Sequence, residues 1–457
     1  MTVPAEVFRA YDIRGIAGRV LSAALVREVG RALGTLGHTR GAPAFAVGRD
    51  GRLSSPELCA ALMDGLNAAG ADVIELGVVP TPLTYFAAQH LGCHSAVMVT
   101  GSHNPGDHNG LKMVVAGTPL TGEDIQGLRR SVEAGRFDSG AGKRSKADLL
   151  EAYLERIAGD VRLARPMHIA MDCGNGVGGV AGPRLFRKLG CEVIELFSEV
   201  DGRFPNHHPD PSKLENLAAL VSELQSGPAE LGLAFDGDAD RLGVVTKRGA
   251  IILPDRQLML YAQDVLSRNP GAEIIYDVKC TRLLGPWIER QGGRATIWKT
   301  GHSLIKAKLK ETGAPLAGEM SGHIFFKERW YGFDDALYCG ARLLEILSRQ
   351  ADACAPLEAL PDAPCTPELN WKLAEGEPHA LIARLRDSAP FPDATRLLAI
   401  DGVRAEFADG FGLARASNTT PVIVLRFEGD TPQALARIQE KFRATLLALK
   451  PGALLPF

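Results

Sequence analysis

The sequence predicts an α/β protein with three similar mixed α/β domains followed by a smaller α+β domain. Three observations predict this class. A strand–helix–strand pattern recurs three times in the first three quarters of the chain, the last quarter changes to a succession of short strands, and stretches rich in proline or glycine separate the parts. At 457 residues, the chain is long enough for roughly three or more domains of ~150 residues each.

Each copy of the recurring pattern is an apolar strand, a helix at the 3.6-residue period and, after a glycine, a second apolar strand. Strands joined in this way pair in parallel through a right-handed crossover. The alternative is that three unrelated units look alike because βαβ units are common. In the first copy we expect a strand at 44–51, a helix at 54–70 capped by Ser54 or Ser55, and a strand at 71–77. The second copy has its strand, helix and strand at 168–176, 182–190 and 191–197. The third copy has them at 273–279, 282–293 and 294–301.

Two stretches indicate domain boundaries. Residues 136–148 are rich in glycine, serine and charge and precede a helix from Leu149, and residues 355–368 carry four prolines. Beyond them, 396–429 reads as short antiparallel strands and 431–449 as a closing helix. We therefore expect domains at 1–148, 149–250, 251–362 and 363–457.

Composition excludes several classes of protein. The hydrophobic fraction of 46% and charged fraction of 23% are those of a soluble globular protein, and a net charge of −3 gives no basic surface for nucleic acid or an anionic membrane. The eight cysteines are scattered without a C-x-x-C pair, which is typical of buried thiols in a reducing compartment. Charged residues interrupt the first fifteen residues, and no apolar run could span a bilayer. We expect a cytoplasmic protein.

The most informative segment is Asp236-Gly-Asp-Ala-Asp240, which follows the apolar run 231–235. A strand that ends in a tight acidic loop brings three hard oxygen ligands to one point, and adjacent carboxylates repel one another unless a cation lies between them. The loop therefore indicates Mg²⁺ or a similar hard cation, and with it phosphate chemistry.

Three other interpretations of this loop compete with a magnesium site. A Ca²⁺ hand needs glycine after the third aspartate and an acidic twelfth residue, but Arg241 and Lys247 occupy those positions. A solvated acidic turn remains possible. An apolar strand ending in D-x-D also describes phosphatases in which the first aspartate, here Asp236, is the covalent nucleophile.

A second segment, Thr100-Gly-Ser-His-Asn-Pro105, follows the apolar run 96–99. Gly101 lets the chain turn sharply, which exposes Ser102 beside His103, and Lys112 follows a few residues later. An exposed serine with a base nearby can carry a transferable group. The segment is not a G-x-S-x-G elbow, so a hydrolase is disfavoured, and the alternative is an ordinary serine, asparagine and proline turn.

Two further loops suit a phosphosugar. In 318–323, Glu319 can accept two hydroxyl hydrogen bonds, and Ser321 and His323 add polar contacts. In 415–421, Arg415 offers a planar fork for phosphate, and hydroxyl and amide donors crowd one turn. The alternatives are an ordinary polar loop and a hydroxyl-rich hairpin turn. The donors of the second loop are Ser417, Asn418 and Thr419.

Taken together and in this order, FRAYDIRG (8–15), TGSHNP with Lys112, DGDADR, GEMSGH and RASNTTP closely resemble the α-D-phosphohexomutase family, above all its bacterial phosphomannomutase/phosphoglucomutase members. The resemblance runs nearly end to end. It implies a heart-shaped enzyme whose four domains surround one central cleft, which agrees with the three repeats and the distinct C-terminal part.

The resemblance also implies a reaction. Hexose 1-phosphate and hexose 6-phosphate would interconvert through a phosphoserine at Ser102 and a 1,6-bisphosphate intermediate, which also acts as activator. Mannose and glucose are both expected, because no residue clearly distinguishes them at C2. The intermediate must turn end for end, so the last domain should hinge, and 355–368 is the expected hinge. Phosphosugars would be the partners of a monomer that binds neither nucleic acid nor membrane.

The family pattern assigns roles residue by residue. Ser102, Asp236, Asp238 and Asp240 would hold Mg²⁺, and Lys112 is a better candidate than His103 for proton transfer. The full catalytic set would be Ser102, His103, Lys112, Arg241, Arg14 and His323. The sugar and its second phosphate would contact Tyr11, Lys279, His302, Glu319, Ser321, Arg415, Ser417, Asn418 and Thr419.

One departure is His108, which occupies a place where members often carry an aromatic residue.

Three rival functions remain open. A phosphoglucosamine mutase is disfavoured by Met320 and the RASNTTP loop, and a phosphatase would use Asp236 as nucleophile. A non-catalytic sugar-phosphate-binding protein would not need Ser102, Lys112 and the three aspartates together.

Overall fold

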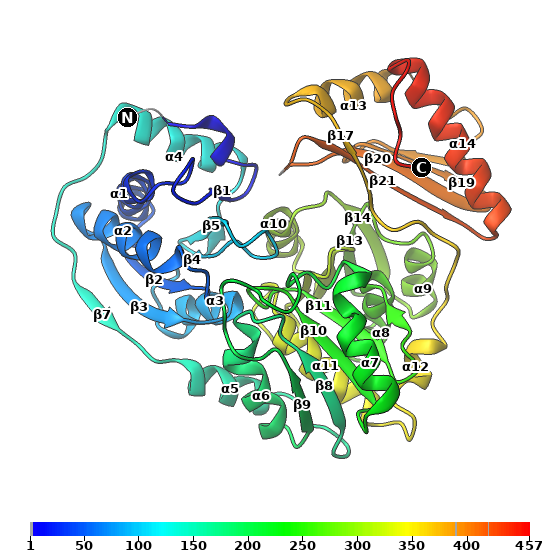
Figure 1. Cartoon of the computed structure of the whole chain (residues 1–457), viewed down its shortest axis with the longest axis horizontal. Helices are drawn as coiled ribbons and strands as arrows, with labels where there is room; N and C mark the ends of the chain where they lie inside the picture. Colours follow the sequence, from blue (N-terminus) through cyan, green and yellow to red (C-terminus); the bar gives the residue numbers. More distant parts are fainter. Residues whose placement is uncertain (1–2, 389–390, 419) are drawn as a thin grey trace.

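The computed structural model describes residues 3–388, 391–418 and 420–457, which form four β-sheets in chain order. We call the sheets with their helices domains I to IV. Figure 1 shows domain I and domain IV on opposite sides of domains II and III, which lie together between and below them. The sequence boundaries at 148 and 362 fall between the sheets, whereas 250 falls inside the second sheet, because residues 251–252 pair with 244–245; all three remain predictions. The four-domain α/β fold class is confirmed.

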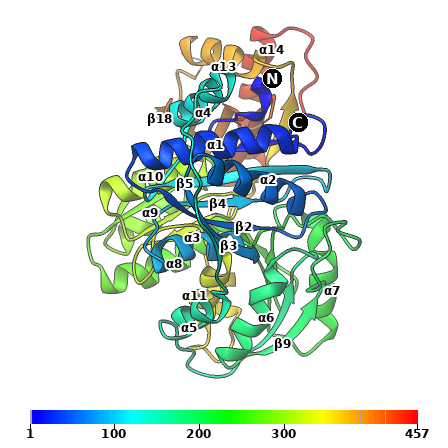
Figure 2. The ribbon, with the colours of Figure 1, turned by 90° about the vertical axis from the view of Figure 1, so that its left-hand side faces the viewer.

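Domain I holds a seven-stranded sheet in the order β1-β5-β4-β2-β3-β7, with β6 paired to β5. Helices cover both faces (Figure 2), and successive residues of β2 belong to different cores: Val47 packs under α1, α2 and α4, and Ala46 packs on the α3 side. The strands are β1 (Ile13–Ile16), β2 (Ala44–Arg49), β3 (Asp72–Val78), β4 (Ala96–Val99), β5 (His108–Val115), β6 (Thr118–Pro119) and β7 (Arg144–Lys146); the helices are α1 (Ala23–Thr39), α2 (Ser55–Ala68), α3 (Thr81–His90) and α4 (Gly122–Ala134).

Domains II and III each centre on a mixed sheet, in the orders β12-β11-β10-β8-β9 and β14-β13-β15-β16. Their strands are β8 (His168–Asp172), β9 (Glu192–Leu196), β10 (Leu231–Phe235), β11 (Leu242–Thr246), β12 (Ile251–Ile252), β13 (Glu273–Asp277), β14 (Arg294–Trp298), β15 (Leu316–Gly318) and β16 (Ile324–Phe326). Their helices are α5 (Leu150–Ala158), α6 (Gly178–Lys188), α7 (Ala218–Ser226), α8 (Pro254–Arg268), α9 (Leu284–Arg290), α10 (His302–Thr312), α11 (Ala336–Leu347) and α12 (Ala355–Glu358). One continuous hydrophobic core joins α3 of domain I to both.

Domain IV is an antiparallel sheet in the order β17-β21-β20-β19-β18, covered by α13 and α14. It has its own hydrophobic core, and a smaller cluster of Val278, Phe411 and Leu413 joins it to domain III. Its elements are β17 (Leu369–Lys372), α13 (Glu377–Asp387), β18 (Arg396–Leu398), β19 (Val403–Phe407), β20 (Gly410–Ala416), β21 (Val422–Gly429) and α14 (Pro432–Leu449). Two short 3₁₀ helices, Ala5–Val7 and Leu214–Leu217, complete the described elements.

The repeated units predicted from the sequence are confirmed, since β2 pairs with β3, β8 with β9 and β13 with β14, each in parallel. The antiparallel strands and closing helix of the last domain are also confirmed. Three details differ. Residues 144–146 add a strand to the sheet of domain I, α12 lies within the proline-rich stretch, and β17 was not anticipated. Ser54 is the N-cap of α2, but its side chain makes no capping hydrogen bond.

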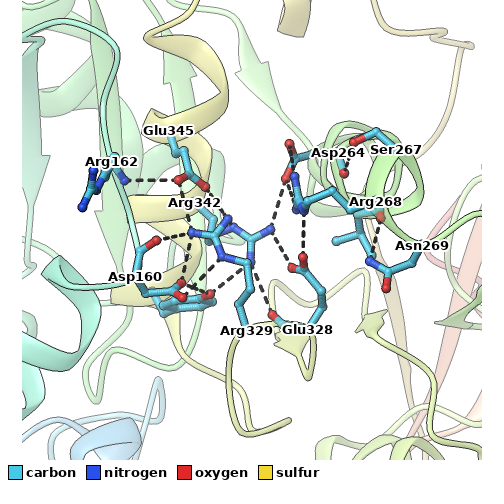
Figure 3. Close-up of polar contacts among 12 residues, drawn as sticks. Asp160, Arg162, Asp264, Ser267, Arg268, Asn269, Glu328, Arg329, Arg342 and Glu345 are labelled. Carbon is cyan, nitrogen blue, oxygen red and sulfur yellow. Dashed lines mark hydrogen bonds and ion pairs between the residues drawn. The ribbon is translucent and has the colours of Figure 1, made fainter.

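A buried ionic network ties domains II and III together (Figure 3). The Arg342 side chain of α11 is fully buried and lies 3.1 Å from Asp264 and 2.9 Å from Glu328. Arg329 extends the network to Glu345, at 2.8 Å, and to Asp160 after α5. Each buried charge has an opposite partner, which is the condition for tolerating it in the core.

Removing Arg342 should therefore destabilise the molecule strongly. The substitution Arg342→Met leaves Asp264, Glu328 and Glu345 without their central cation, and breaking a buried pair costs about 3–5 kcal/mol. Urea unfolding measures this loss. The matched control is Arg349→Met, whose side chain is 51% exposed and lies 3.4 Å from Asp264, so its loss should cost at most about 1 kcal/mol. Equal losses in the two variants would contradict this account of the network.

Candidate active site

Two strand-end loops from different domains meet at the site. The loop after β10 carries Asp236 to Asp240, and the loop after β4 carries Ser102. A side chain at Gly237 would lie 2.4 Å from the Ser102 carbonyl oxygen, so only glycine allows this approach. Thr81, at the start of α3, fixes the contact: its backbone N–H donates to the Asp238 carbonyl at 3.0 Å, and its hydroxyl donates to the Asp238 carboxylate at 2.5 Å.

Ser102 is buried, so the expectation that the turn exposes it was wrong, and it is held in an unusual backbone conformation. Its φ is +50°, in the left-handed region that non-glycine residues seldom occupy. Its Oγ donates to Asp236 Oδ2 at 3.1 Å and lies 3.2 Å from His103 Nδ1. Burial and the positive charges of Arg241 and Arg14 hold the pKa of the His103 imidazole well below its ordinary value, so the ring is neutral at pH 7.

A buried arginine organises the serine loop from beneath. The Arg52 guanidinium donates to four carbonyl oxygens of this loop: Ser102 at 2.7 Å, Asn104 at 2.6 Å, Pro105 at 2.5 Å and His108 at 3.0 Å. Asp50 lies 3.2 Å from Arg52 Nε, and its carboxylate accepts from the Thr100 hydroxyl and the Gly101 N–H. These bonds account for the strained serine, because they fix the backbone on both sides of it.

The three aspartates can hold a metal ion. Their carboxylate oxygens lie within 4.8 Å of one another, all three residues are fully buried, and the Oδ1 atoms of Asp238 and Asp240 have no hydrogen-bond partner among the described residues. Burial and the charges of Asp238 and Asp240 raise the pKa of Asp236 well above its ordinary value. A hard divalent cation would relieve this repulsion and satisfy the free oxygens, so the residues fit the ion predicted from the sequence.

Lys112 reaches the same cluster from β5. Its Nζ donates to Asp238 at 2.7 Å and also contacts Asp240. Burial alone would lower the pKa of Lys112, but the two carboxylates outweigh burial and raise it above its ordinary value. In this arrangement Lys112 is a fixed positive charge beside Ser102.

Arg241 and His323 form a chain of contacts behind the triad. Arg241 Nε donates to His323 Nε2 at 3.0 Å, so Nε2 carries the lone pair and the proton of a neutral ring lies on Nδ1. Nδ1 lies 2.9 Å from Asp334, whose other oxygen accepts from Lys306 at 2.9 Å. His323 therefore orients Arg241, which stands 3.9 Å from Asp236.

The predicted sugar-binding residues line the adjoining part of domain III. Glu319 accepts from the Gly301 N–H at 2.6 Å and from the Ser321 hydroxyl at 3.0 Å, and burial raises the pKa of Glu319. The rings of Tyr11 and His302 meet edge to face with centroids 5.0 Å apart, and burial raises the pKa of Tyr11 to about 12. Arg14 donates to Asn104 at 3.1 Å, which ties the N-terminal segment to the serine loop.

The proposed phosphate anchor lies on domain IV. Arg415 Nε donates to Asp401 at 3.0 Å, and Lys279 of domain III donates to Glu368 at 2.9 Å. Ser417 accepts from Thr420, while Thr419 lies outside the described residues. Asn418 borders a cavity of about 450 Å³, whose wall also includes Ala10, Lys299 and Arg386 from domains I, III and IV. This cavity opens between the three domains.

The structure thus brings Ser102, His103, Lys112, Arg241, His323 and the aspartates to one point and places Arg415, Ser417 and Asn418 on a separate domain. Sequence reasoning missed Arg52, Thr81, Asp334 and Glu368. The first had a signal, since Arg-Asp-Gly-Arg (49–52) follows a strand as the two chemical loops do. Thr81 and Glu368 act through partners far away in the sequence, so no local signal could have identified them, and Asp334, which contacts the nearby His323, stands in a loop without a recognisable pattern.

Together, four α/β-type domains and a buried serine beside an aspartate triad define a class of multidomain enzymes with a cation site. The residues match family models described as phosphoglucomutase/phosphomannomutase: alpha/beta/alpha domain I at 5–139, domain II at 151–249, domain III at 253–362 and the C-terminal domain at 368–445. The chain belongs to the phosphoglucomutase/phosphomannomutase family.

Similar proteins and solved structures support the same family. A phosphomannomutase/phosphoglucomutase from Pseudomonas putida is 54% identical over 100% of this chain and 98% of its own length. A phosphoglucomutase from Neisseria gonorrhoeae is 55% identical over 97% of each chain. The crystal structure of a phosphoglucomutase/phosphomannomutase family protein from Burkholderia thailandensis covers 100% of both chains, with 56% identity and a TM-score of 0.95. Within the described part of this chain, no helix has the length and apolar character needed to cross a membrane.

Replacing Arg52 should loosen the serine loop selectively. In Arg52→Lys a single ammonium cannot span four carbonyl groups, so several hydrogen bonds of about 1 kcal/mol each are lost. Hydrogen exchange should become at least about tenfold faster at residues 101–108, with exchange in α7 unchanged. The control is Arg49→Lys, because Arg49 donates to the Asp50 carbonyl and not to the loop. Unaltered exchange at 101–108 in Arg52→Lys would refute this role.

Proposed function

We propose that the chain interconverts hexose 1-phosphate and hexose 6-phosphate, with mannose and glucose as the sugars. The observation that carries this proposal is the Ser102 hydroxyl, 3.1 Å from Asp236 in a buried triad that also contacts Lys112. A serine whose loop is fixed beside a cation site suits the transfer of a phosphoryl group. The relatives named as mutases support the same reaction.

In the proposed cycle, phosphorylated Ser102 is the resting form. The sugar binds with its phosphate toward Arg415, Ser417, Asn418 and Thr419 and its free hydroxyl toward Ser102. The hydroxyl oxygen forms a bond to phosphorus while the Ser102 Oγ–P bond breaks, which yields a 1,6-bisphosphate. That intermediate turns end for end, and Ser102 takes up the other phosphoryl group. Each turnover therefore leaves the serine phosphorylated.

The other residues support this transfer. Asp236, Asp238, Asp240 and the serine phosphate would hold Mg²⁺, which neutralises phosphoryl charge when bound. Lys112 and Arg241 add positive charge around the transferred group. The attacking hydroxyl loses a proton, for which the neutral imidazole of His103 is the candidate acceptor; Lys112, favoured from the sequence, already carries its proton in this arrangement. Glu319 and Ser321 would bind sugar hydroxyls, with Tyr11, Arg14, Lys279, His302 and His323 around them.

Several finer statements belong to this proposal. We infer a monomer in the cytoplasm whose partners are phosphosugars, with hexose 1,6-bisphosphate as intermediate and activator, and with domain boundaries near 148, 250 and 362. The alternative with Asp236 as a phosphatase nucleophile is less well supported, because Asp236 accepts hydrogen bonds from Ser102 and from the backbone N–H groups of Asp240 and Arg241.

The serine can be tested by removal. Ser102→Ala lacks the oxygen that carries the phosphoryl group, so mutase turnover should fall on the order of 10³-fold or more, with unfolding unchanged. A coupled assay of hexose 6-phosphate formation measures this loss. The control is Ser226→Ala, since the Ser226 hydroxyl on the exposed end of α7 donates to the Ser222 carbonyl one turn earlier in the same helix. Near-normal turnover in Ser102→Ala would rule out the phosphoserine cycle.

The metal site can be tested by titration. Asp238→Asn removes one of the three charges that face the cation, so the Mg²⁺ concentration for half-maximal activity should rise at least about tenfold. Calorimetric titration of Mg²⁺ provides a second readout. Asp201→Asn is the matched control, because Asp201 pairs with Arg203 on an exposed loop. An identical Mg²⁺ titration for Asp238→Asn and the parent would contradict the assignment.

A further inference from the structure

A carboxylate already pairs with Lys279, a cation of domain III next to the proposed phosphate anchor of domain IV. Lys279 follows β13, and its side chain is only 6% exposed. Its Nζ donates to Glu368 Oε2 at 2.9 Å. Glu368 immediately precedes β17, and its side chain is 40% exposed, so part of it reaches the surface while the Lys279 side chain is buried. Solvent and a ligand can therefore reach the carboxylate side of this pair.

Lys279 faces the domain that carries Arg415. The Lys279 carbonyl accepts from Arg426 Nη1 of β21 at 2.6 Å, and β21 pairs with β20, where Arg415 lies. The charge of Arg415 also acts on Lys279 and lowers its pKa, although Glu368 and Asp277 outweigh burial and Arg415 and leave that pKa raised. Arg415 thus lies near enough to the Lys279–Glu368 pair for its charge to act on both side chains.

The two cations are paired in different ways. Asp401, the partner of Arg415, also accepts from the Thr300 N–H at 2.9 Å, so this carboxylate is fixed by a second bond. Lys279 is the partner that the structure gives the Glu368 carboxylate. Burial would raise the pKa of Glu368, but Lys279, with Arg415 and Lys213, lowers it to about 2. Glu368 is therefore ionised at pH 7, and Lys279 is its one hydrogen-bonded partner among the described residues.

We propose that Glu368 competes with the substrate phosphate for Lys279. This inference rests on the proposed function, in which the intermediate must leave the anchor and turn in every cycle. A phosphate dianion carries more charge than one carboxylate, so it displaces Glu368 on binding. When the phosphate leaves, Glu368 takes back the ammonium, which would otherwise be left buried without a partner.

Competition of this kind weakens the anchor and speeds release. A phosphate held by both Lys279 and Arg415 without an internal rival would bind more tightly but turn more slowly. Binding that is equally strong before and after the chemical step lowers KM without raising kcat. Glu368 would thus lower the affinity for the substrate phosphate and raise kcat. It would act in the step in which the intermediate turns end for end.

The test is Glu368→Gln, which keeps the size of the side chain and removes its charge. The account predicts that the Kd for inorganic phosphate, and the KM for hexose 1-phosphate, fall about two- to fivefold, the range expected for a partly exposed ion pair. kcat should fall by a similar factor because release slows. Calorimetry and steady-state kinetics on the full chain measure these quantities.

Two comparisons make the test specific. Glu440→Gln breaks an exposed pair with Arg443 on α14, so it should leave Kd, KM and kcat unchanged. In a Lys279→Met background, Glu368→Gln should no longer alter the Kd for phosphate, because the contested cation is absent.

A Kd and KM that rise or stay constant in Glu368→Gln would overturn the proposal and leave Glu368 a merely structural role. An unchanged effect of Glu368→Gln in the Lys279→Met background would overturn it as well. A wrong proposed function gives a different result: the parent protein would not turn over hexose phosphate at all. The titration with inorganic phosphate needs no turnover, so it tests the competition by itself.

Discussion

The site depends on the contact between the serine loop of domain I and the acidic loop of domain II. Ser102 belongs to one domain and Asp236 to another, and their side chains meet at 3.1 Å. Gly237 permits the approach, and Thr81 bonds to Asp238 across the same boundary. Because one hydrophobic core joins domains I to III, these loops are held in register by packing that involves dozens of buried residues.

Domain IV is attached to the other domains in a different way. Its core is separate, and it rests on domain III through Arg404 and Arg426, which donate to the carbonyl groups of Val278, Cys280 and Lys279. A rigid centre for chemistry with a separately packed domain for the second phosphate suits a reaction whose intermediate must turn. The position of Glu368, just before β17, places its charge where the chain passes from one unit to the other.

Much of this arrangement could be predicted from the sequence, because the strongest signals were local. The strand 231–235 and the strand 96–99 were expected at the bounds that the structure gives, and each ends in its chemical loop. The parallel pairing of the three repeats followed from periodicity. The missing parts are those that depend on distant partners. Arg52 lies 50 residues from Ser102, the residue whose carbonyl group it binds. Asp334 orients His323 from a loop before α11. The strands β7 and β17 are short, and only their pairing with neighbouring strands defines them.

The central claim is that Ser102 carries the phosphoryl group beside the acidic triad. Its most direct test is to incubate the purified chain with hexose 1,6-bisphosphate and Mg²⁺, and to locate the covalent phosphate by peptide mass spectrometry. The account predicts one phosphoryl group, on Ser102, that survives hydroxylamine. A hydroxylamine-labile phosphate on Asp236, or hexose phosphate turnover with no phosphate on Ser102, would contradict it.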